Sequence, residues 1–286
     1  MANKQATSGS LSVAPAPWTC KCETYWLLFY ARGPLPENVY DPLEAASAEF
    51  SDPAIAGEYR GGLGMIQIVR YSETPVGGYD ELLIIPGYFD RPGGKKNWRV
   101  TRIYVSQRDT CYNGRKNWNF PKHLARFEFS HPPTQASSAP PTTLKVQVFP
   151  PDQKASRPFF TATLQPSRWL PQVPFSTKIA SYVGMDVFLV QPPLPTGDKP
   201  DEELLCGTTE WMGSMPYLYS NKARGMWVDI ESVKGSEAQG EGGEQQPLLD
   251  TRELEGWWPK SFEPWKIGLW LEEATLIVPE SEEISS

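Results

Sequence analysis

Apolar and polar positions along the chain follow the two-residue period of half-buried strands more often than the period of a helix. Turns rich in glycine and proline separate the apolar segments. Strands are expected at residues 23–31, 61–71, 80–86, 98–105, 122–130, 144–149, 158–164, 186–190, 204–210, 225–231 and 267–278. Because these segments show no alternation with long helices, they predict a mainly β fold, an antiparallel sheet closed into a barrel around a cavity.

Two short helices are expected between the strands. Asp41 is a candidate N-cap, and a proline and several alanines follow it, which predicts a helix over residues 41–50. Asp109 can cap a second helix that runs to about residue 118, and Pro121 prevents its continuation. The fold class is therefore mainly β with a few short helices.

Composition indicates one large domain. Residues 1–16 are small, polar and proline-containing, so we expect them to be disordered. Residues 17–279 are expected to form a single barrel domain, with mobile insertions at about 131–143 and 233–247. Residues 280–286 form an acidic tail.

The charge of the chain argues against a nucleic-acid partner, because its formal net charge is −7 and phosphate binding needs a basic face. No segment is apolar for long enough to cross a bilayer, and the first twelve residues lack a signal-peptide pattern. We therefore expect a soluble, cytoplasmic protein without a membrane partner. The 11 tryptophans, 12 tyrosines and 12 phenylalanines fit strands and a pocket lined with aromatic rings.

The cysteines and histidines do not have the spacing of a zinc site. Cys20 and Cys22 lie on the same side of an expected strand, but no second close pair of ligands accompanies them. We expect small buried thiols, with no metal and no cofactor.

The strongest candidate for chemistry is Lys122, in the segment GRKNWNFPKHLA at residues 114–125. Pro121 precedes this lysine and an alternating strand follows it, so its Cα is held in place. Burial disfavours the charged form of an amine, and a neutral lysine attacks a ketone to form a Schiff base. The alternative is that the stem of Lys122 covers apolar surface while its ammonium reaches water.

Three further polar residues lie either in the site or away from it. Glu81 lies inside the apolar run DELLIIP, so it is either an outward strand residue or a cavity carboxylate. Arg115 either pairs with Asp109 at the surface or supports the site. His123 should point away from Lys122 if both lie in a regular strand.

The segment GRKNWNFPK, residues 114–122, resembles the active-site segment of the acetoacetate decarboxylase superfamily. The segment YSE at residues 71–73, before a glycine-rich turn, resembles the glutamate segment of that superfamily. The similarity is strongest over residues 61–129 and is closer still to a fungal-type branch. It implies a cone-shaped antiparallel barrel and a small-molecule substrate, with a homo-oligomer as one candidate assembly.

The resemblance also implies roles for individual residues. Lys122 falls on the Schiff-base lysine of the superfamily, and Glu73 on its glutamate, an acid or base beside the imine. Tyr71, Arg115 and His123 lie in the matching segments and would support substrate or site. Glu81 is a further supporting candidate from its place in the apolar run DELLIIP, independently of the resemblance.

Two positions depart from the superfamily pattern. The second lysine of its pair is His123 here, and an imidazole is a less constant cation than an ammonium. The early strand has no arginine to meet a substrate carboxylate, and Lys21 is not a bidentate substitute for one.

Three functions are therefore considered. The first is a cofactor-independent Schiff-base lyase: a decarboxylase, aldolase or dehydratase acting on a keto acid or polyketide-like compound. The second is a non-catalytic barrel that binds an apolar small molecule. The third is an enzyme of secondary metabolism, such as a cyclase or hydrolase, that uses the cavity without an imine.

Overall fold

The structure is a computed structural model that describes residues 10–135, 138–179, 187–197, 203–231, 254, 256–259 and 262–285. Within these residues one sheet contains sixteen strands, and four short helices lie around it. The predicted mainly β class is therefore confirmed. No helix in the described ranges is both long and apolar enough to cross a membrane.

The strands are β1 (Trp18–Ala31), β2 (Tyr59–Glu73), β3 (Tyr79–Ile85), β4 (Tyr88–Asp90), β5 (Lys96–Trp98), β6 (Arg102–Val105), β7 (Lys122–Leu124), β8 (Arg126–Phe129), β9 (Leu144–Phe149), β10 (Phe160–Pro166), β11 (Val173–Ser176), β12 (Leu189–Gln191), β13 (Met212–Ser214), β14 (Tyr217–Ile230), β15 (Ile267–Val278) and β16 (Glu282–Glu283). The helices are α1 (Pro42–Ala45), α2 (Ala48–Ser51), α3 (Pro53–Ala56) and α4 (Arg108–Trp118).

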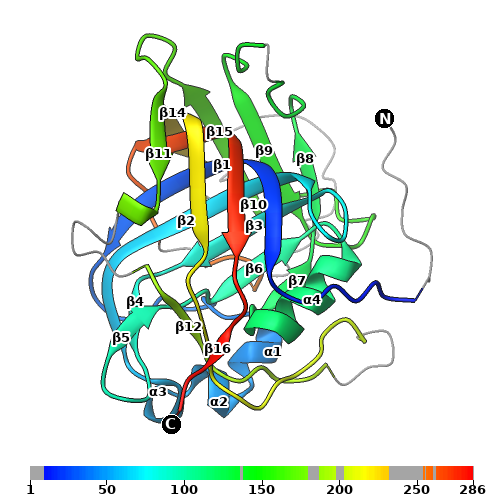
Figure 1. The fold of residues 1–286 in the computed structure, drawn as a ribbon, viewed down its shortest axis with the longest axis vertical. Helices are drawn as coiled ribbons and strands as arrows, with labels where there is room; N and C mark the ends of the chain where they lie inside the picture. Colours follow the sequence, from blue (N-terminus) through cyan, green and yellow to red (C-terminus); the bar gives the residue numbers. More distant parts are fainter. Residues whose placement is uncertain are drawn as a thin grey trace, which may run out of the picture.

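Four long strands form the centre of the sheet, in the order β2, β1, β15 and β14, with antiparallel neighbours. Figure 1 shows β1 and β2 as long curved strands that pass across the direction of β14 and β15. The path of paired strands ends at β16 on one side and at β8 on the other, and no described pair joins these two ends. Closure of the barrel by hydrogen bonds therefore stays a prediction.

A second branch of the sheet carries the candidate lysine. It runs from β2 to β3, β6 and β7, and β7 is parallel to β6 with Lys122 opposite Ile103. Helix α4 connects these two parallel strands. Asn119 ends the helix in the left-handed conformation, with φ 54°. The helix therefore stops just before Pro121 and delivers Lys122 directly into β7.

The middle of β2 and most of β3 are buried on both faces, which explains why apolar residues are frequent there. Met65 and Leu83 belong to one buried cluster, whereas Ile66 and Leu82 belong to another on the opposite face. Because successive side chains of a strand point to opposite faces, each strand contributes to both clusters. The first cluster surrounds the cavity described below.

Several predicted elements differ in extent from the observed ones. The single helix expected at residues 41–50 is two helices, α1 and α2, and Asp41 makes no side-chain capping bond. Gln107 caps α4 in place of Asp109, because its side chain accepts a hydrogen bond from the Thr110 N–H. No strand forms at residues 204–210, whereas β11, β13 and the first half of β14 were not predicted.

The strand expected at residues 98–105 is divided into β5 and β6. Between them, the amide of Gln191 bonds both the N–H and the carbonyl of Val100, at 2.9 Å each. A side chain thus takes the place of a neighbouring strand at this point.

The N-terminal residues are tied to α4. The Ala14 N–H donates to Asn113 Oδ1 at 2.8 Å, and Asn113 Nδ2 donates to the Ser12 carbonyl at 2.7 Å. The disorder expected for residues 1–16 therefore does not extend over residues 12–14, while residues 1–9 lie outside the described residues.

Two other expected segments are only partly accessible to comparison. The insertion expected at residues 233–247 lies outside the described residues. The described parts of residues 131–143 contain no helix or strand, and β16 in the acidic tail pairs with β13.

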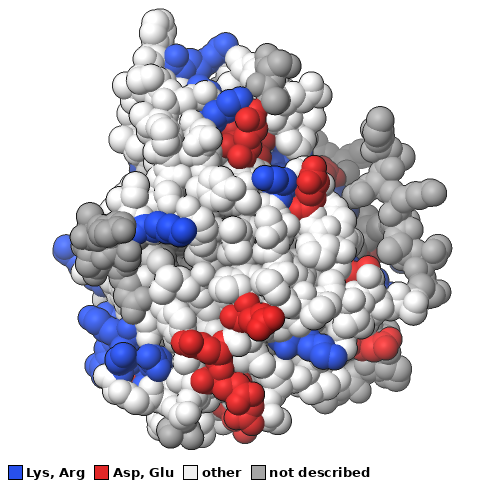
Figure 2. Space-filling model, in the orientation of Figure 1, with Lys and Arg blue, Asp and Glu red and all other residues white. Residues whose placement is uncertain are grey.

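Charged side chains are scattered over the visible surface. Figure 2 shows Lys and Arg in small separate groups near Asp and Glu, with wide uncharged areas between them.

Candidate active site

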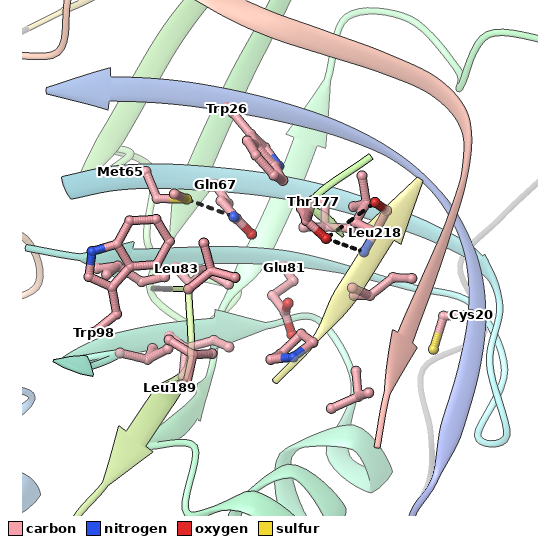
Figure 3. A pocket seen from close by; sticks show the side chains of 18 of the residues that line it. Cys20, Trp26, Met65, Gln67, Glu81, Leu83, Trp98, Thr177, Leu189 and Leu218 are labelled. Carbon is pink, nitrogen blue, oxygen red and sulfur yellow. Dashed lines mark hydrogen bonds between the residues drawn. The ribbon is translucent and has the colours of Figure 1, made fainter. Parts of the chain in front are cut away.

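An apolar cavity of about 400 Å³ lies between the long strands and the branch that ends in β7. Figure 3 shows side chains from several strands converging on it. Its apolar lining residues are Trp18, Trp26, Leu28, Leu63, Met65, Val69, Leu83, Ile85, Trp98, Val100, Ile103, Trp118, Phe120, Pro174, Phe175, Ile179, Val187, Leu189, Pro216, Leu218, Leu269, Leu276 and Val278. Its polar lining residues are Cys20, Gln67, Tyr71, Tyr79, Glu81, Lys122, Ser176 and Thr177. The volume and the apolar wall are typical of a small-molecule site.

Lys122 lines this cavity and is only 4% exposed. Its Nζ lies 2.8 Å from Glu81 Oε2 in an ion pair and donates to Thr110 Oγ1 at 3.0 Å. The hydroxyl of Tyr79 is 3.5 Å away. The alternative interpretation, in which the ammonium of Lys122 reaches water, therefore does not hold.

Gly114 makes room for the stem of Lys122. A Cβ at position 114 would lie 2.5 Å from Lys122 Cδ and 2.6 Å from its Cε. Such distances are far below ordinary van der Waals contact, so any larger residue on this face of α4 would displace the lysine. This close approach explains why position 114, the first residue of the GRKNWNFPK segment, is a glycine.

Glu81 is a cavity carboxylate and not an outward strand residue, the other interpretation that its sequence allowed. It alternates with Tyr79 and Leu83 on the inner face of β3 and is 3% exposed. Tyr71, from the neighbouring strand β2, donates its hydroxyl to Glu81 Oε1 at 3.0 Å. Burial, together with the charge of Glu81, raises the pKa of Tyr71 and of Tyr79 well above the usual range. Both phenols are therefore neutral; Tyr71 donates to the Glu81 carboxylate, and Tyr79 accepts from Lys122.

Glu73 and Lys21 do not line the cavity. Both side chains are exposed, and the two residues face each other across β2 and β1. Lys21 Nζ donates to Thr275 Oγ1 at 2.9 Å. The structure therefore brings Glu81, and not Glu73, to the amine of Lys122.

Arg115 lies behind Lys122 and is fully buried. Its Nη1 forms an ion pair with Glu44 Oε1 at 2.8 Å, so of the two interpretations the surface pair with Asp109 does not hold. The guanidinium also donates to the carbonyls of Cys206, at 3.1 Å, and Pro195, at 2.8 Å. Its Nη1 reaches the carbonyl of Lys122 at 3.4 Å. Arg115 thus fixes the backbone of the lysine from outside the cavity.

His123 points away from the cavity, as expected for the residue after Lys122. Its Nε2 lies 2.7 Å from Glu44 Oε2 and 3.6 Å from Asp41 Oδ1. Sequence analysis missed Glu44, a carboxylate on the short helix α1 that is 0% exposed. Burial alone would raise the pKa of Glu44, but His123 and Arg115 outweigh it and hold this pKa at about 2.

Asp41, Glu44 and His123 are the candidate metal ligands among the described residues. One ligand atom each of Asp41, Glu44 and His123 lies within 4.8 Å of the others. However, the guanidinium of Arg115 already binds Glu44, and its positive charge would oppose a metal cation there. We therefore interpret this group as a support for β7.

The depressed pKa of Glu44 predicts a loss of stability in acid. The ionised carboxylate stabilises the folded state above its unfolded pKa of 4.5, and this contribution is lost as the pH falls through about 2. The ionised Glu44 contributes about 3 kcal/mol to the free energy of unfolding at pH 7, and we expect about 2 kcal/mol of this contribution to be lost by pH 3. Urea unfolding of the wild type and of Glu44→Gln at a series of pH values measures it. The difference between the two proteins should shrink in acid; a constant difference would contradict the prediction.

The cysteines are free and do not take part in a metal site in the described structure. Cys20 lines the cavity beside the ion pair. Burial raises its pKa to about 12, with Lys122 opposing the increase and Glu81 adding to it. Cys20 is therefore a neutral thiol at physiological pH.

Curated relatives match only part of the chain. The rice protein NEOXANTHIN-DEFICIENT 1 is 35% identical over 65 residues, which are 23% of this chain and 21% of the rice protein. The tomato protein of the same name is 26% identical over 126 residues, 43% of this chain and 39% of that protein. The match therefore spans less than half the length of these relatives. No protein-family model matches the sequence.

Solved structures match nearly the whole chain at low sequence identity. Acetoacetate decarboxylase from Legionella pneumophila superposes with a TM-score of 0.54 at 13% identity and covers 99% of this chain and 94% of its own. An acetoacetate decarboxylase-like enzyme from Sphingomonas wittichii has a TM-score of 0.55 at 11% identity, with 100% and 99% coverage. The enduracididine biosynthesis enzyme MppR has a TM-score of 0.54 at 12% identity, with 96% and 91% coverage.

The chain therefore has the fold of the acetoacetate decarboxylase-like enzymes, as the resemblance implied. Solved proteins with this fold are enzymes, and they include both acetoacetate decarboxylase and MppR.

Proposed function

We propose that the protein is a cofactor-independent Schiff-base enzyme, a lyase in which Lys122 is the nucleophile and Glu81 moves the proton. The observation that carries the proposal is the buried amine of Lys122, which lines the cavity 2.8 Å from the Glu81 carboxylate. A nucleophile within hydrogen-bond reach of a base is the arrangement that covalent catalysis needs.

The ion pair can supply each proton that imine formation requires. Glu81 first accepts a proton from the Lys122 ammonium, and the neutral amine attacks the carbonyl carbon of the substrate. The resulting carbinolamine loses its hydroxyl as water, with the proton supplied by Glu81, and an iminium forms. The ammonium and the ketone thus become an iminium and one water, so the positive charge next to Glu81 is conserved.

The iminium then makes an adjacent bond easier to break. It withdraws electrons from the neighbouring carbon, so loss of a proton or cleavage of a carbon–carbon bond leaves an enamine. Glu81 can remove or return the proton at that carbon as general base and acid. The neutral hydroxyl of Tyr71 donates to the same carboxylate, and the ring of Tyr79 packs against that of Tyr71.

The enzymes that share the fold support carbon–carbon bond chemistry. One is an acetoacetate decarboxylase, and one structure of MppR holds the condensation product of pyruvate and imidazole 4-carboxaldehyde. An enamine accounts for both kinds of reaction, because each needs a stabilised carbanion beside a carbonyl carbon.

Borohydride trapping tests the proposal. The full chain is incubated with acetone or 2-undecanone and sodium borohydride, and peptides are mapped by mass spectrometry. We expect one reduced ketone on Lys122 and none on exposed lysines such as Lys266. Absence of an adduct with either ketone, or labelling confined to surface lysines, would sink the proposal.

The role of Glu81 predicts a separate effect on proton transfer. In deuterated water, the wild type should exchange the α-hydrogens of a bound ketone through the enamine. Glu81→Gln keeps the shape of the side chain but cannot accept a proton, so exchange per trapped adduct should fall about 100-fold. Deuterium in the recovered ketone is measured by mass spectrometry.

Glu73→Gln is the matched control, because Glu73 is exposed and outside the cavity lining. It should exchange at the wild-type rate. Wild-type exchange in Glu81→Gln would remove Glu81 as the base.

A second candidate function is binding of an apolar molecule without chemistry. The nearly continuous apolar wall of the cavity favours it. It predicts saturable ligand binding with no adduct on Lys122.

A further inference from the structure

The cavity wall holds one ion pair and no other charged side chain among the described lining residues. Lys122 is the cation, and Glu81 neutralises it at 2.8 Å. We infer that the site takes an uncharged, elongated apolar molecule that carries a carbonyl group, and that it excludes keto acids. The carbonyl part of this inference rests on the proposed function, whereas the apolar and uncharged part rests on the cavity alone.

A substrate carboxylate would have no free cation to bind. The only lining ammonium in the described structure is already paired, so a carboxylate would also face the negative charge of Glu81. Lys21, on β1, bonds Thr275 and does not line the cavity. Burying an unpaired carboxylate in an apolar wall is strongly unfavourable, and a like charge nearby increases the cost.

The polar groups gather at one place on the wall, which gives the ligand a direction. Lys122 on β7 contacts Glu81 and Tyr79 on β3, and Tyr71 on β2 contacts Glu81, with β6 between β7 and β3 in the sheet. In Figure 3, Trp98, Leu189 and Met65 lie on the opposite side of Glu81 from Cys20. A ligand with its carbonyl at Lys122 would therefore extend its apolar part towards Trp98, Leu189 and Met65.

Gln67 offers a second, uncharged contact. It lies on β2 within the wall, and its Nε2 donates to the thioether of Met65 at 2.8 Å. A thioether is a weak acceptor, so a ligand oxygen would replace it readily. Gln67 is thus placed to bind a hydroxyl or carbonyl oxygen, and it cannot neutralise a carboxylate.

Tryptophan fluorescence provides the test, because Trp18, Trp26, Trp98 and Trp118 line the cavity. The full chain is titrated near neutral pH with 2-undecanone and with decanoate, which have the same number of non-hydrogen atoms. We expect 2-undecanone to bind at least about tenfold more tightly, since its burial carries no charge penalty. Equal or tighter binding of decanoate, or no quenching by either compound, would overturn the inference.

Two substitutions of Gln67 test whether charge decides the preference. Gln67→Lys adds a cation to the wall and should tighten decanoate binding about tenfold, whereas Gln67→Met should not. Circular dichroism checks that each variant folds. Unchanged decanoate binding in folded Gln67→Lys would show that charge is not what excludes the carboxylate. If this variant does not fold, the wild-type comparison still decides.

Ligand titration and borohydride trapping together distinguish this inference from the proposed function. Preference for 2-undecanone without a borohydride adduct would leave the uncharged ligand and remove the Schiff base. An adduct on Lys122 together with equal binding of decanoate would leave the Schiff base and remove the inference.

Discussion

Lys122→Met should reduce the borohydride-trapped ketone adduct at least about 100-fold, to the level of background labelling. Methionine has a similar length and suits the apolar wall, so it fills the space beside Gly114 without an amine. The measurement is peptide mapping after reduction with 2-undecanone, with circular dichroism as a check of folding. The substitution leaves Glu81 without its cation and so costs stability, but the apolar lining is unchanged, and 2-undecanone should still quench tryptophan fluorescence.

Lys116→Met is the control for this result. Lys116 lies on the same helix as Gly114, but its side chain is exposed and contacts Tyr112. It should form the adduct at the wild-type level. An adduct that persists in Lys122→Met would show that another amine reacts, and the assignment of the nucleophile would be wrong.

Arg115→Met should destabilise the protein by about 3–5 kcal/mol, since it breaks a buried ion pair from one side. Glu44 would be left as an uncompensated carboxylate with only His123 beside it. The carbonyls of Cys206 and Pro195 would lose a donor as well. Urea unfolding near neutral pH measures the effect.

Two comparisons isolate the cause of this destabilisation. Lys266→Met removes an exposed ion pair with Asp229, and its stability should match the wild type. The double variant Arg115→Met with Glu44→Gln should lose less than the sum of the single variants, because neither charge is then left unpaired. If Arg115→Met is no more destabilising than Lys266→Met, the ion pair does not support the site.

The strands were predictable where burial leaves a pattern in the sequence. The run at residues 80–86 is apolar because β3 is buried on both faces. By contrast, the first half of β14 was missed, since its sequence YLYSNKAR mixes polar and apolar residues. Its strand conformation comes from antiparallel pairing with β15. Tertiary pairing thus overrides a weak local preference.

The site was predictable only in part, for a similar reason. Alternation shows which residues share a face of a strand, but it does not show which face is inward, so Glu81 kept two interpretations. Glu73 has the same parity as Tyr71, yet it lies where β2 leaves the cavity and reaches solvent. Glu44 meets Arg115 across 71 residues of sequence, and no local pattern announces such a long-range pair.

The position of Lys122 Nζ depends on the absence of a side chain at Gly114. Helix α4 presents only a hydrogen to the stem of Lys122 at Gly114, and one extra methyl group there would collide with Cδ and Cε. The stem would have to swing, and Nζ would leave its place beside Glu81. Gly114 has no side chain, yet it determines where the amine of Lys122 lies. We therefore expect Gly114→Ala to abolish ketone adduct formation at Lys122, although Lys122 and Glu81 are both still present.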